Sequence, residues 1–228
     1  MATPFYVAPE QMMQDRAEYA RKGIARGRSL AAVSWEHGVL FVSENPSRLL
    51  SKTSEIYDRI AFGAVGKYNE FESLRVAGIR MADVKGYQYA REDVTAKSLA
   101  TAYSQSLGAI FMGDGKPYEV ELLIAQVNGA STPVELFHIL YDGSIVDEAD
   151  VVAIGGDAEA ITTRLREQWT PGLDLGGAVR LAVHALAGAT ERDPGAPDLE
   201  VSGLDRTRGR RQFFRLDEDR LADLLARE

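Results

Sequence analysis

The chain has 228 residues, of which 45% are hydrophobic and 26% charged, a composition typical of a globular protein of one or two domains. Its formal net charge of −8 disfavours a nucleic-acid-binding surface, because such surfaces take most of their affinity from clustered lysines and arginines. The absence of cysteine excludes disulfides, thiolate catalysis and cysteine zinc sites, and no run of apolar residues is long enough to cross a membrane.

The segment 9–27 predicts an N-terminal helix. Its apolar residues recur at spacings of four, three and four, which places one narrow stripe along the helix and leaves the other faces charged; they are Met13, Ala17, Ala20 and Ile24. Pro9 suits a first helical turn. The residues before it, MATPFYVA, lack the basic start and apolar core of a secretory signal, so we expect a cytoplasmic protein.

The next part of the chain alternates strands with helices. Residues 29–45 predict two strands joined by a tight turn at His37 and Gly38, and Ile56–Val65 predicts a third strand. A helix is expected from Lys67 to Lys85, with Gly78 allowing close packing. A second helix is expected to follow, with Asp93 as its N-cap.

GDGKP, residues 113–117, breaks that helix and precedes strands at 120–127 and 134–142. Both strands are apolar on both faces, which is typical of a sheet covered on both sides. The remaining segments predict a short strand near 151, helices at 157–169 and 173–187, two strands, and a closing helix. Strand runs alternating with helix pairs indicate a single α+β domain with antiparallel sheets and outer helix layers.

The residues alone predict no catalytic group, metal or cofactor. The three histidines, His37, His138 and His184, lie far apart and lack metal-ligand spacing. Gly155-Gly156, between a strand and a helix, is either a tight turn or an anion-binding nest. The basic run 206–211 (RTRGRR) predicts a hairpin turn, because it separates two strand-like segments.

Several segments together resemble a known family. They are EYARKGIARG (18–27), GVLFVSENPS (38–47), SRLLSKTSEIYDRIAFGAVGKYNEF (47–71), KPYEVELLIAQV (116–127) and YDGSIVDE (141–148). With these motifs the chain resembles the α subunits of the 20S proteasome over nearly its whole length, and most closely the actinobacterial members.

The resemblance implies the four-layer αββα sandwich of the Ntn hydrolases over residues 9–228, with the helix 9–27 at its front and a gating tail at 1–8. It also implies the partners. Seven α subunits form a ring that stacks on proteasome β subunits, which cut the peptide bonds, and a ring-shaped ATPase activator docks on the α ring by its carboxyl terminus. The family's α subunits need no cofactor, and neither nucleic acid nor membrane is an expected partner.

The resemblance further implies that the chain is not itself an enzyme. Catalytic β subunits use an N-terminal threonine, whereas the corresponding strand here begins near Arg28 and Ser29, behind the helix, where no free amine exists. Glu44 matches the catalytic aspartate, and Glu55 or Ile56 stands where the lysine would be. Two alternatives stay open: a self-processing threonine peptidase of the same fold, and a ligand-binding domain built around Gly155-Gly156.

The resemblance assigns the docking pocket to Lys52, which would receive the activator's terminal carboxylate, with Gly66 and Lys67 at its border. The motif residues Glu18, Tyr19 and Arg21 would border the same pocket and contact the neighbouring subunit.

The gate and the pore constriction follow from the same resemblance. Phe5, Tyr6 and Val7 would form the gate, turned by Pro9, although the Tyr-Asp-Arg cluster of archaeal and eukaryotic members is missing. Residues 115–120, in particular Lys116 and Tyr118, would narrow the ring's pore.

Overall fold

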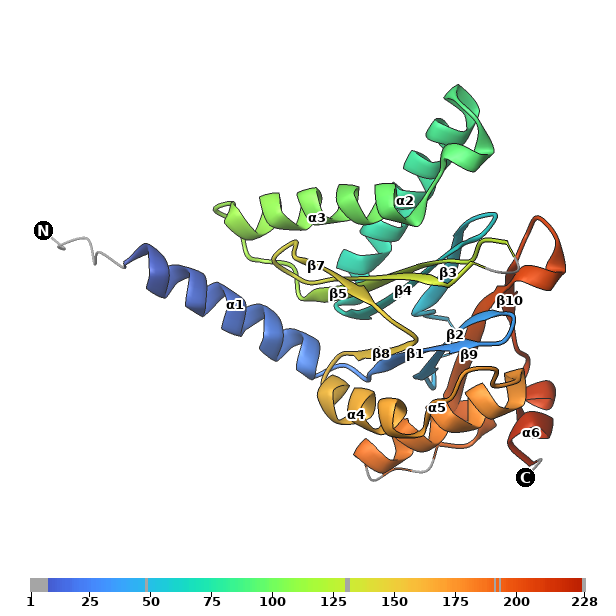
Figure 1. The fold of residues 1–228 in the computed structure, drawn as a ribbon. Coiled ribbons are helices and arrows are strands. Elements are labelled where there is room, and N and C mark those ends of the chain that lie inside the picture. Colours follow the sequence, from blue (N-terminus) through green and yellow to red (C-terminus); the bar gives the residue numbers. More distant parts are fainter. Residues whose placement is uncertain (1–7, 48, 130–131, 191, 193, 227–228) are drawn as a thin grey trace, which may run out of the picture.

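Two five-stranded antiparallel sheets lie face to face between helices in the computed structural model, which describes residues 8–47, 49–129, 132–190, 192 and 194–226 (Figure 1). The first sheet has the order β10-β9-β2-β1-β8. Its strands are β1 (Leu30–Trp35), β2 (Gly38–Glu44), β8 (Val151–Ile154), β9 (Leu199–Asp205) and β10 (Phe213–Arg215). The second has the order β3-β4-β5-β6-β7. Its strands are β3 (Thr53–Tyr57), β4 (Ile60–Gly66), β5 (Val120–Gln126), β6 (Glu135–Ile139) and β7 (Ile145–Glu148).

The helices complete the expected four layers. α2 (Tyr68–Gln88) and α3 (Ala96–Met112) cover the outer face of the second sheet, and α4 (Ala158–Gln168), α5 (Leu175–Thr190) and α6 (Glu218–Ala226) cover the first (Figure 1). The described connections contain three short 3₁₀ turns: Arg91–Asp93, Ala196–Asp198 and Arg206–Arg208. Within the described chain no helix is both long and apolar enough to span a bilayer.

The core is divided among these layers, as strands with two apolar faces predict. In β5, Leu122 and Ile124 pack against α2 and α3, whereas Leu123 and Ala125 face the other sheet. Gly78 of α2 lies so close to Tyr103 of α3 that a Cβ at this position would overlap with the tyrosine hydroxyl. The expected close packing at Gly78 is confirmed.

Two sequence expectations are wrong in detail. The strand expected at Ile56–Val65 is a hairpin, because Asp58 and Arg59 form a two-residue turn between β3 and β4. The N-cap of α3 is Thr95, whose hydroxyl accepts a hydrogen bond from Ser98 N at 3.2 Å. Asp93 instead accepts from the amide of Ala90 within the preceding 3₁₀ turn.

The N-terminal helix α1 (Pro9–Ala25) projects from one end of the sandwich (Figure 1). Only Ala20 and Ile24 of this helix are buried, so the C-terminal half of the predicted stripe carries the packing. Arg16 donates to the carbonyl oxygens of Phe111 and Ile110 at 2.8 and 3.2 Å. This contact ties α1 to the C-terminal end of α3, where the helix dipole favours a cation.

The Gly155-Gly156 turn connects β8 to α4 and contacts the segment between α1 and β1. Gly155 has φ +107, and a Cβ there would lie 3.0 Å from Ser29 Cα; a Cβ on Gly156 would lie 2.7 Å from Ala25 O. The amide of Gly155 donates to Glu121 Oε2 at 3.4 Å, and the amide of Asp157 donates to Ser29 Oγ at 3.3 Å. These contacts support the tight-turn interpretation, because the amides of Gly155 and Asp157, which an anion would need, already donate to side chains of the same chain.

Candidate functional site

Lys52 lies just before β3, with its side chain directed to the start of β1. Its ammonium donates to Arg28 O at 2.6 Å and to Ser43 Oγ at 3.0 Å, and approaches Glu44 O at 3.5 Å. A lysine ammonium carries three N–H donors, so two are well bonded and the third is only weakly bonded. Lys52 is partly exposed as a residue, and its third donor is the one that an incoming acceptor could take.

The surroundings of Lys52 change its basicity. Burial lowers the pKa of the Lys52 ammonium from 10.5 to about 8; the positive charge of Arg28 adds to this effect, and the carboxylates of Glu200 and Glu44 oppose it. At neutral pH Lys52 is thus still charged but is less well solvated than a surface lysine. A partly desolvated cation binds a carboxylate more strongly than an exposed one, since the effective dielectric constant is lower.

Gly66 and Lys67 lie at the same end of the sandwich as Lys52. The Lys52 carbonyl accepts from the amide of Ala64 at 2.9 Å, and a Cβ on Gly27 would lie 3.7 Å from Gly66 N. Gly66 has φ +99, and a Cβ there would overlap with the carbonyl oxygen of Glu119. The structure therefore brings Lys52 and Gly66 to the chain segment that links α1 to β1, whereas the Lys67 ammonium lies 3.6 Å from Glu119 Oε2.

Two arginines hold Glu44 beside this segment. Arg28 pairs with Glu44 Oε1, and Arg192 lies 3.2 Å from Glu44 Oε2. Glu44 therefore serves as the counter-charge of two cations, although its position matches a catalytic carboxylate in the resemblance.

Ser29 stands where a catalytic relative would carry its nucleophile. It is buried, at 4% exposure, and its nitrogen belongs to the peptide bond that joins it to Arg28. Glu55 and Ile56, the positions compared with the catalytic lysine, are occupied elsewhere: Glu55 pairs with Arg211 at 2.6 Å, and Ile56 is in the core. The lysine that reaches the start of β1 is Lys52, a position that the sequence comparison did not identify as its counterpart.

Glu200, at the start of β9, is the component of this site that the sequence did not reveal. Its carboxylate accepts from both backbone amides next to the Lys52 side chain, those of Lys52 at 2.9 Å and Thr53 at 3.1 Å. Burial alone would raise the pKa of Glu200, but hydrogen bonds, the strongest from Arg215 and Thr53, outweigh burial and hold the pKa below its usual value. Glu200 is therefore a buried, negatively charged carboxylate that is bonded to the backbone on both sides of the Lys52 Cα.

The loop from Gly113 to Glu119 is held against α2 and α1. Lys116 pairs with Glu70 and lies 3.1 Å from Glu119 Oε2 and 5.9 Å from the centre of the Tyr19 ring. Burial would lower the pKa of the Lys116 ammonium, but the hydrogen bonds that it donates to Glu70 and Glu119 outweigh burial and raise the pKa. Tyr118 packs as a partly buried side chain on the α2–α3 core.

The other predicted helix residues lie on α1. Glu18 pairs with Lys22 at 2.6 Å, Tyr19 is 48% exposed, and Arg21 donates to Tyr141 Oη at 2.8 Å. Tyr19 thus contacts the loop from Gly113 to Glu119 through Lys116, and Arg21 reaches the turn before β7. The predicted gate residues Phe5, Tyr6 and Val7 lie outside the described residues, whereas Pro9 begins α1.

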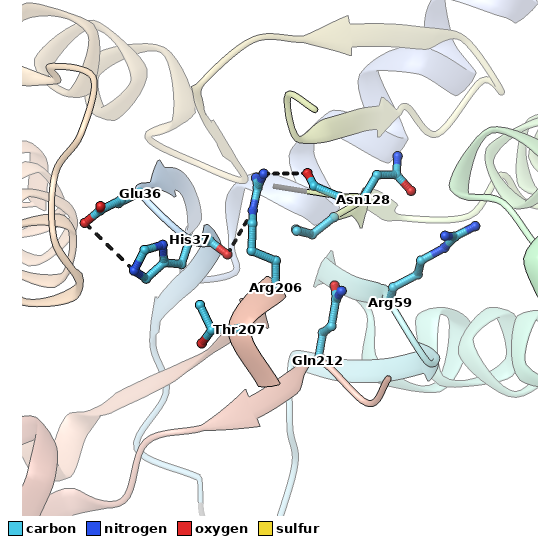
Figure 2. Close-up of a pocket in the computed structure, with 9 residues that line it drawn as sticks. Glu36, His37, Arg59, Asn128, Arg206, Thr207 and Gln212 are labelled. Atoms are coloured by element: carbon cyan, nitrogen blue, oxygen red, sulfur yellow. Dashed lines mark hydrogen bonds and ion pairs between the residues drawn. The ribbon is translucent and has the colours of Figure 1, made fainter. Parts of the chain in front are cut away.

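A hollow of about 540 Å³ lies at the opposite end of the strands, beside the turns that follow β1, β3 and β9 (Figure 2). Arg206 crosses it and donates to the carbonyl oxygens of His37 at 3.3 Å, Gly129 at 2.9 Å and Thr132 at 3.1 Å. The arginine thereby joins the loops of both sheets, and the run RTRGRR forms the predicted connection between β9 and β10. Among the described residues no group of three histidines and acids is arranged to hold a metal ion.

The comparisons with known proteins agree with this geometry. Residues 24–200 match the family described as "Proteasome subunit". The chain is 56% identical to the proteasome subunit alpha of Kineococcus radiotolerans, with 99% of each chain covered. It is 54% identical to that of Acidothermus cellulolyticus and 52% identical to that of Thermobifida fusca, over 99% of this chain and 98% and 91% of theirs. The resemblance found in the sequence is confirmed: the chain belongs to the proteasome subunit family.

Proposed function

We propose that the chain is the non-catalytic α-ring subunit of a 20S proteasome core particle. In this proposal seven copies form the outer ring, β subunits degrade the substrate, and the α ring admits substrates and docks a ring-shaped ATPase activator. The assignment is supported by the relatives, which are named proteasome subunit alpha and align over 91–99% of their own length. The proposal includes the cytoplasmic location expected from the sequence.

The position of Lys52 carries the docking part of the proposal. Its ammonium is fixed at the junction of α1, β1 and β2, is partly desolvated, and retains one weakly bonded donor. A terminal carboxylate can accept this donor in a charge-assisted hydrogen bond. Gly66 and Lys67 would border the bound carboxylate, and Glu18, Tyr19 and Arg21 on α1 would contribute contacts with the neighbouring ring subunit.

The gate is proposed from the sequence resemblance, and the contacts of Lys116 and Tyr118 support a role of their loop in the constriction. Residues 1–8, with Phe5, Tyr6 and Val7, would form the gate in front of Pro9. Lys116 and Tyr118 belong to a loop held by Glu70 and Glu119, which would give the pore constriction a fixed shape. A rigid loop suits a constriction, since its diameter then stays constant as substrates pass.

The main alternative, a self-processing threonine peptidase, has less support. Threonine-type catalysis uses the free amine of the nucleophile as its base. Here Ser29 is 4% exposed and follows α1, which is anchored by Arg16 and Arg21, so processing would have to remove an ordered helix. The intact mass distinguishes the two, because a processed subunit would lose the residues before Ser29.

The test of the proposal is activator-stimulated degradation by particles assembled from this chain and a proteasome β subunit. Lys52→Ala should lower stimulation about tenfold, the loss expected from one charge-assisted contact, while ring assembly and basal peptide hydrolysis remain normal. Lys97→Ala, which removes an exposed lysine on α3, is the matched control. Undiminished stimulation in Lys52→Ala particles would contradict the docking role, and a monomer of 25.0 kDa with no ring would contradict the ring assignment.

A further inference from the structure

We propose that Glu200 is the positioning residue of the Lys52 docking site and that activator affinity depends on it although it does not touch the activator. The inference rests on the proposed function, in which Lys52 receives a carboxylate. Glu200 would act by fixing the backbone from which the Lys52 side chain extends. Its role would therefore be to set where the ammonium lies, with no direct part in binding.

The contacts of Glu200 converge on the chain around Lys52. Oε2 accepts from Lys52 N at 2.9 Å and from Asn45 Nδ2 at 2.6 Å. Oε1 accepts from Thr53 N at 3.1 Å, Thr53 Oγ1 at 2.6 Å and Arg215 Nη1 at 2.7 Å. The Glu200 side chain is only 7% exposed, so these bonds form with little competition from water.

This arrangement fixes the direction of the Lys52 side chain. The two amides bound by Glu200 belong to the peptide groups on either side of the Lys52 Cα, so both flanking peptide planes are held. Asn45 extends the restraint upstream, because its Nδ2 also donates to Leu50 O at 2.6 Å. Arg215 extends it downstream by donating to Thr53 O at 2.8 Å. The loop between β2 and β3 is thus tied to β9 and β10 by one carboxylate.

Replacing Glu200 by glutamine would disturb this network without removing the side chain. A carboxylate is acceptor-only, whereas an amide replaces one oxygen with an NH₂ group. Every partner of Glu200 named above is a donor, so the NH₂ group would face donors, and either Lys52 N or Thr53 N would lose its acceptor. A buried donor without a partner moves toward solvent or water, and the Lys52 backbone would move with it.

The experiment uses core particles assembled with β subunits. The probe is a fluorescent peptide with the last eight residues of a ring ATPase activator and a free terminal carboxylate; the same peptide as an amide reports carboxylate-independent binding. We expect Glu200→Gln to raise the Kd of the acid peptide about tenfold, with little change for the amide. The control is Glu55→Gln, which removes an arginine-paired carboxylate on β3 of the other sheet and should leave both Kd values unchanged.

A double-mutant cycle separates positioning from a general structural role. If Glu200 acts through Lys52, then Glu200→Gln in a Lys52→Ala particle causes no further rise in Kd. If the free-energy losses of binding from Glu200→Gln and Lys52→Ala add fully in the double variant, the inference is overturned. Native mass checks that each variant assembles into particles.

The failures of the two proposals are distinguishable. An unchanged Kd in Lys52→Ala particles would refute the docking site itself, whereas a raised Kd in Lys52→Ala with an unchanged Kd in Glu200→Gln would refute only the positioning role. Should Glu200→Gln fail to assemble, Asn45→Ala provides a second variant, because it leaves the buried carboxylate and its arginine intact. Asn45→Ala should also raise the Kd of the acid peptide, and an unchanged value in assembled particles would count against the inference.

Discussion

The ammonium of Lys52 lies 2.6 Å from the carbonyl oxygen of Arg28, which belongs to the segment 26–29 that joins α1 to β1. The proposed docking group is thus attached to the connection through which the N-terminal helix enters the sandwich. In the proposed docking the ligand accepts the third, weakly bonded donor of Lys52, while the contact with Arg28 holds the ammonium in place. One hydrogen bond therefore links the Lys52 side chain to the segment that follows α1.

The first prediction concerns the pH dependence of docking. Because the pKa of Lys52 is lowered to about 8, the ammonium is charged below that pH and is lost as pH rises through it. Affinity for a carboxylate-terminated activator peptide should therefore fall between pH 7 and pH 9.5. Fluorescence anisotropy on assembled particles would measure it, with Lys52→Arg as the control, since an arginine stays charged over this range. A pH-independent affinity in the wild type would argue against a charged Lys52 contact.

The lowered pKa of Lys52 also predicts a pH effect on stability, which should rise with pH where the affinity for the activator falls. The folded-state pKa, about 8, lies below the unfolded value near 10.5, so folding is penalised below pH 8 and the penalty is relieved as pH rises toward 10.5. Between these pH values the melting temperature of the wild type should rise relative to that of Lys52→Met. Scanning calorimetry of both proteins at pH 7.5 and 9.5 checks this, and a difference that does not change with pH would contradict it.

Gly66→Ala should destabilise the protein by about 1–3 kcal/mol, the cost of a strained backbone conformation. Gly66 has φ +99, and an added Cβ would overlap with Glu119 O. Gly115→Ala is the matched control, because nothing lies within 4 Å of its position and its φ is not in the left-handed region. Denaturant unfolding measures the free energy of unfolding of both variants. Equal values for Gly66→Ala and Gly115→Ala would mean that the turn at Gly66 adapts without strain.

Gly78→Ala should also destabilise the protein, by about 1–3 kcal/mol, because it overpacks the contact between α2 and α3. The added Cβ would overlap with the Tyr103 hydroxyl, which is buried and has no hydrogen-bond partner within the described chain. Tyr103→Phe alone should therefore be neutral or slightly stabilising. The double variant should recover part of the loss, since the ring carbon would still lie 2.7 Å away, and no recovery at all would place the strain elsewhere.

Deletion of residues 1–8 tests the predicted gate. Particles assembled with the shortened chain should hydrolyse small peptides faster than the wild type, because the tail with Phe5, Tyr6 and Val7 would no longer obstruct the pore. Native mass controls for assembly, and hydrolysis by isolated β subunits controls for their intrinsic activity. Unchanged rates in intact particles would contradict a gating tail.

Element types were largely predictable from local patterns, and the errors have local causes. Asp58 and Arg59 form the turn between β3 and β4 without a glycine or proline, so the apolar run around them concealed a hairpin. Asp93 and Thr95 are both good cap residues, and the choice between them depends on which one lies before the first helical turn. The Gly155-Gly156 motif allowed two interpretations until the neighbouring main chain at Ala25 and Ser29 was placed.

By itself the sequence determined the layered α+β architecture, the N-terminal helix and the identity of Lys52 as the docking candidate. Periodicity, glycine placement and motifs are local properties and can be read along the chain. The tertiary structure alone decided how Lys52 is held. Glu200 lies 148 residues from Lys52 in sequence, on a strand whose pattern shows only an acidic residue at its start. The role of Glu200 depends on the hydrogen-bond donors around it, which lie in the β2–β3 loop, on β3 and on β10. Only the packing of the two sheets brings these donors to the Glu200 carboxylate.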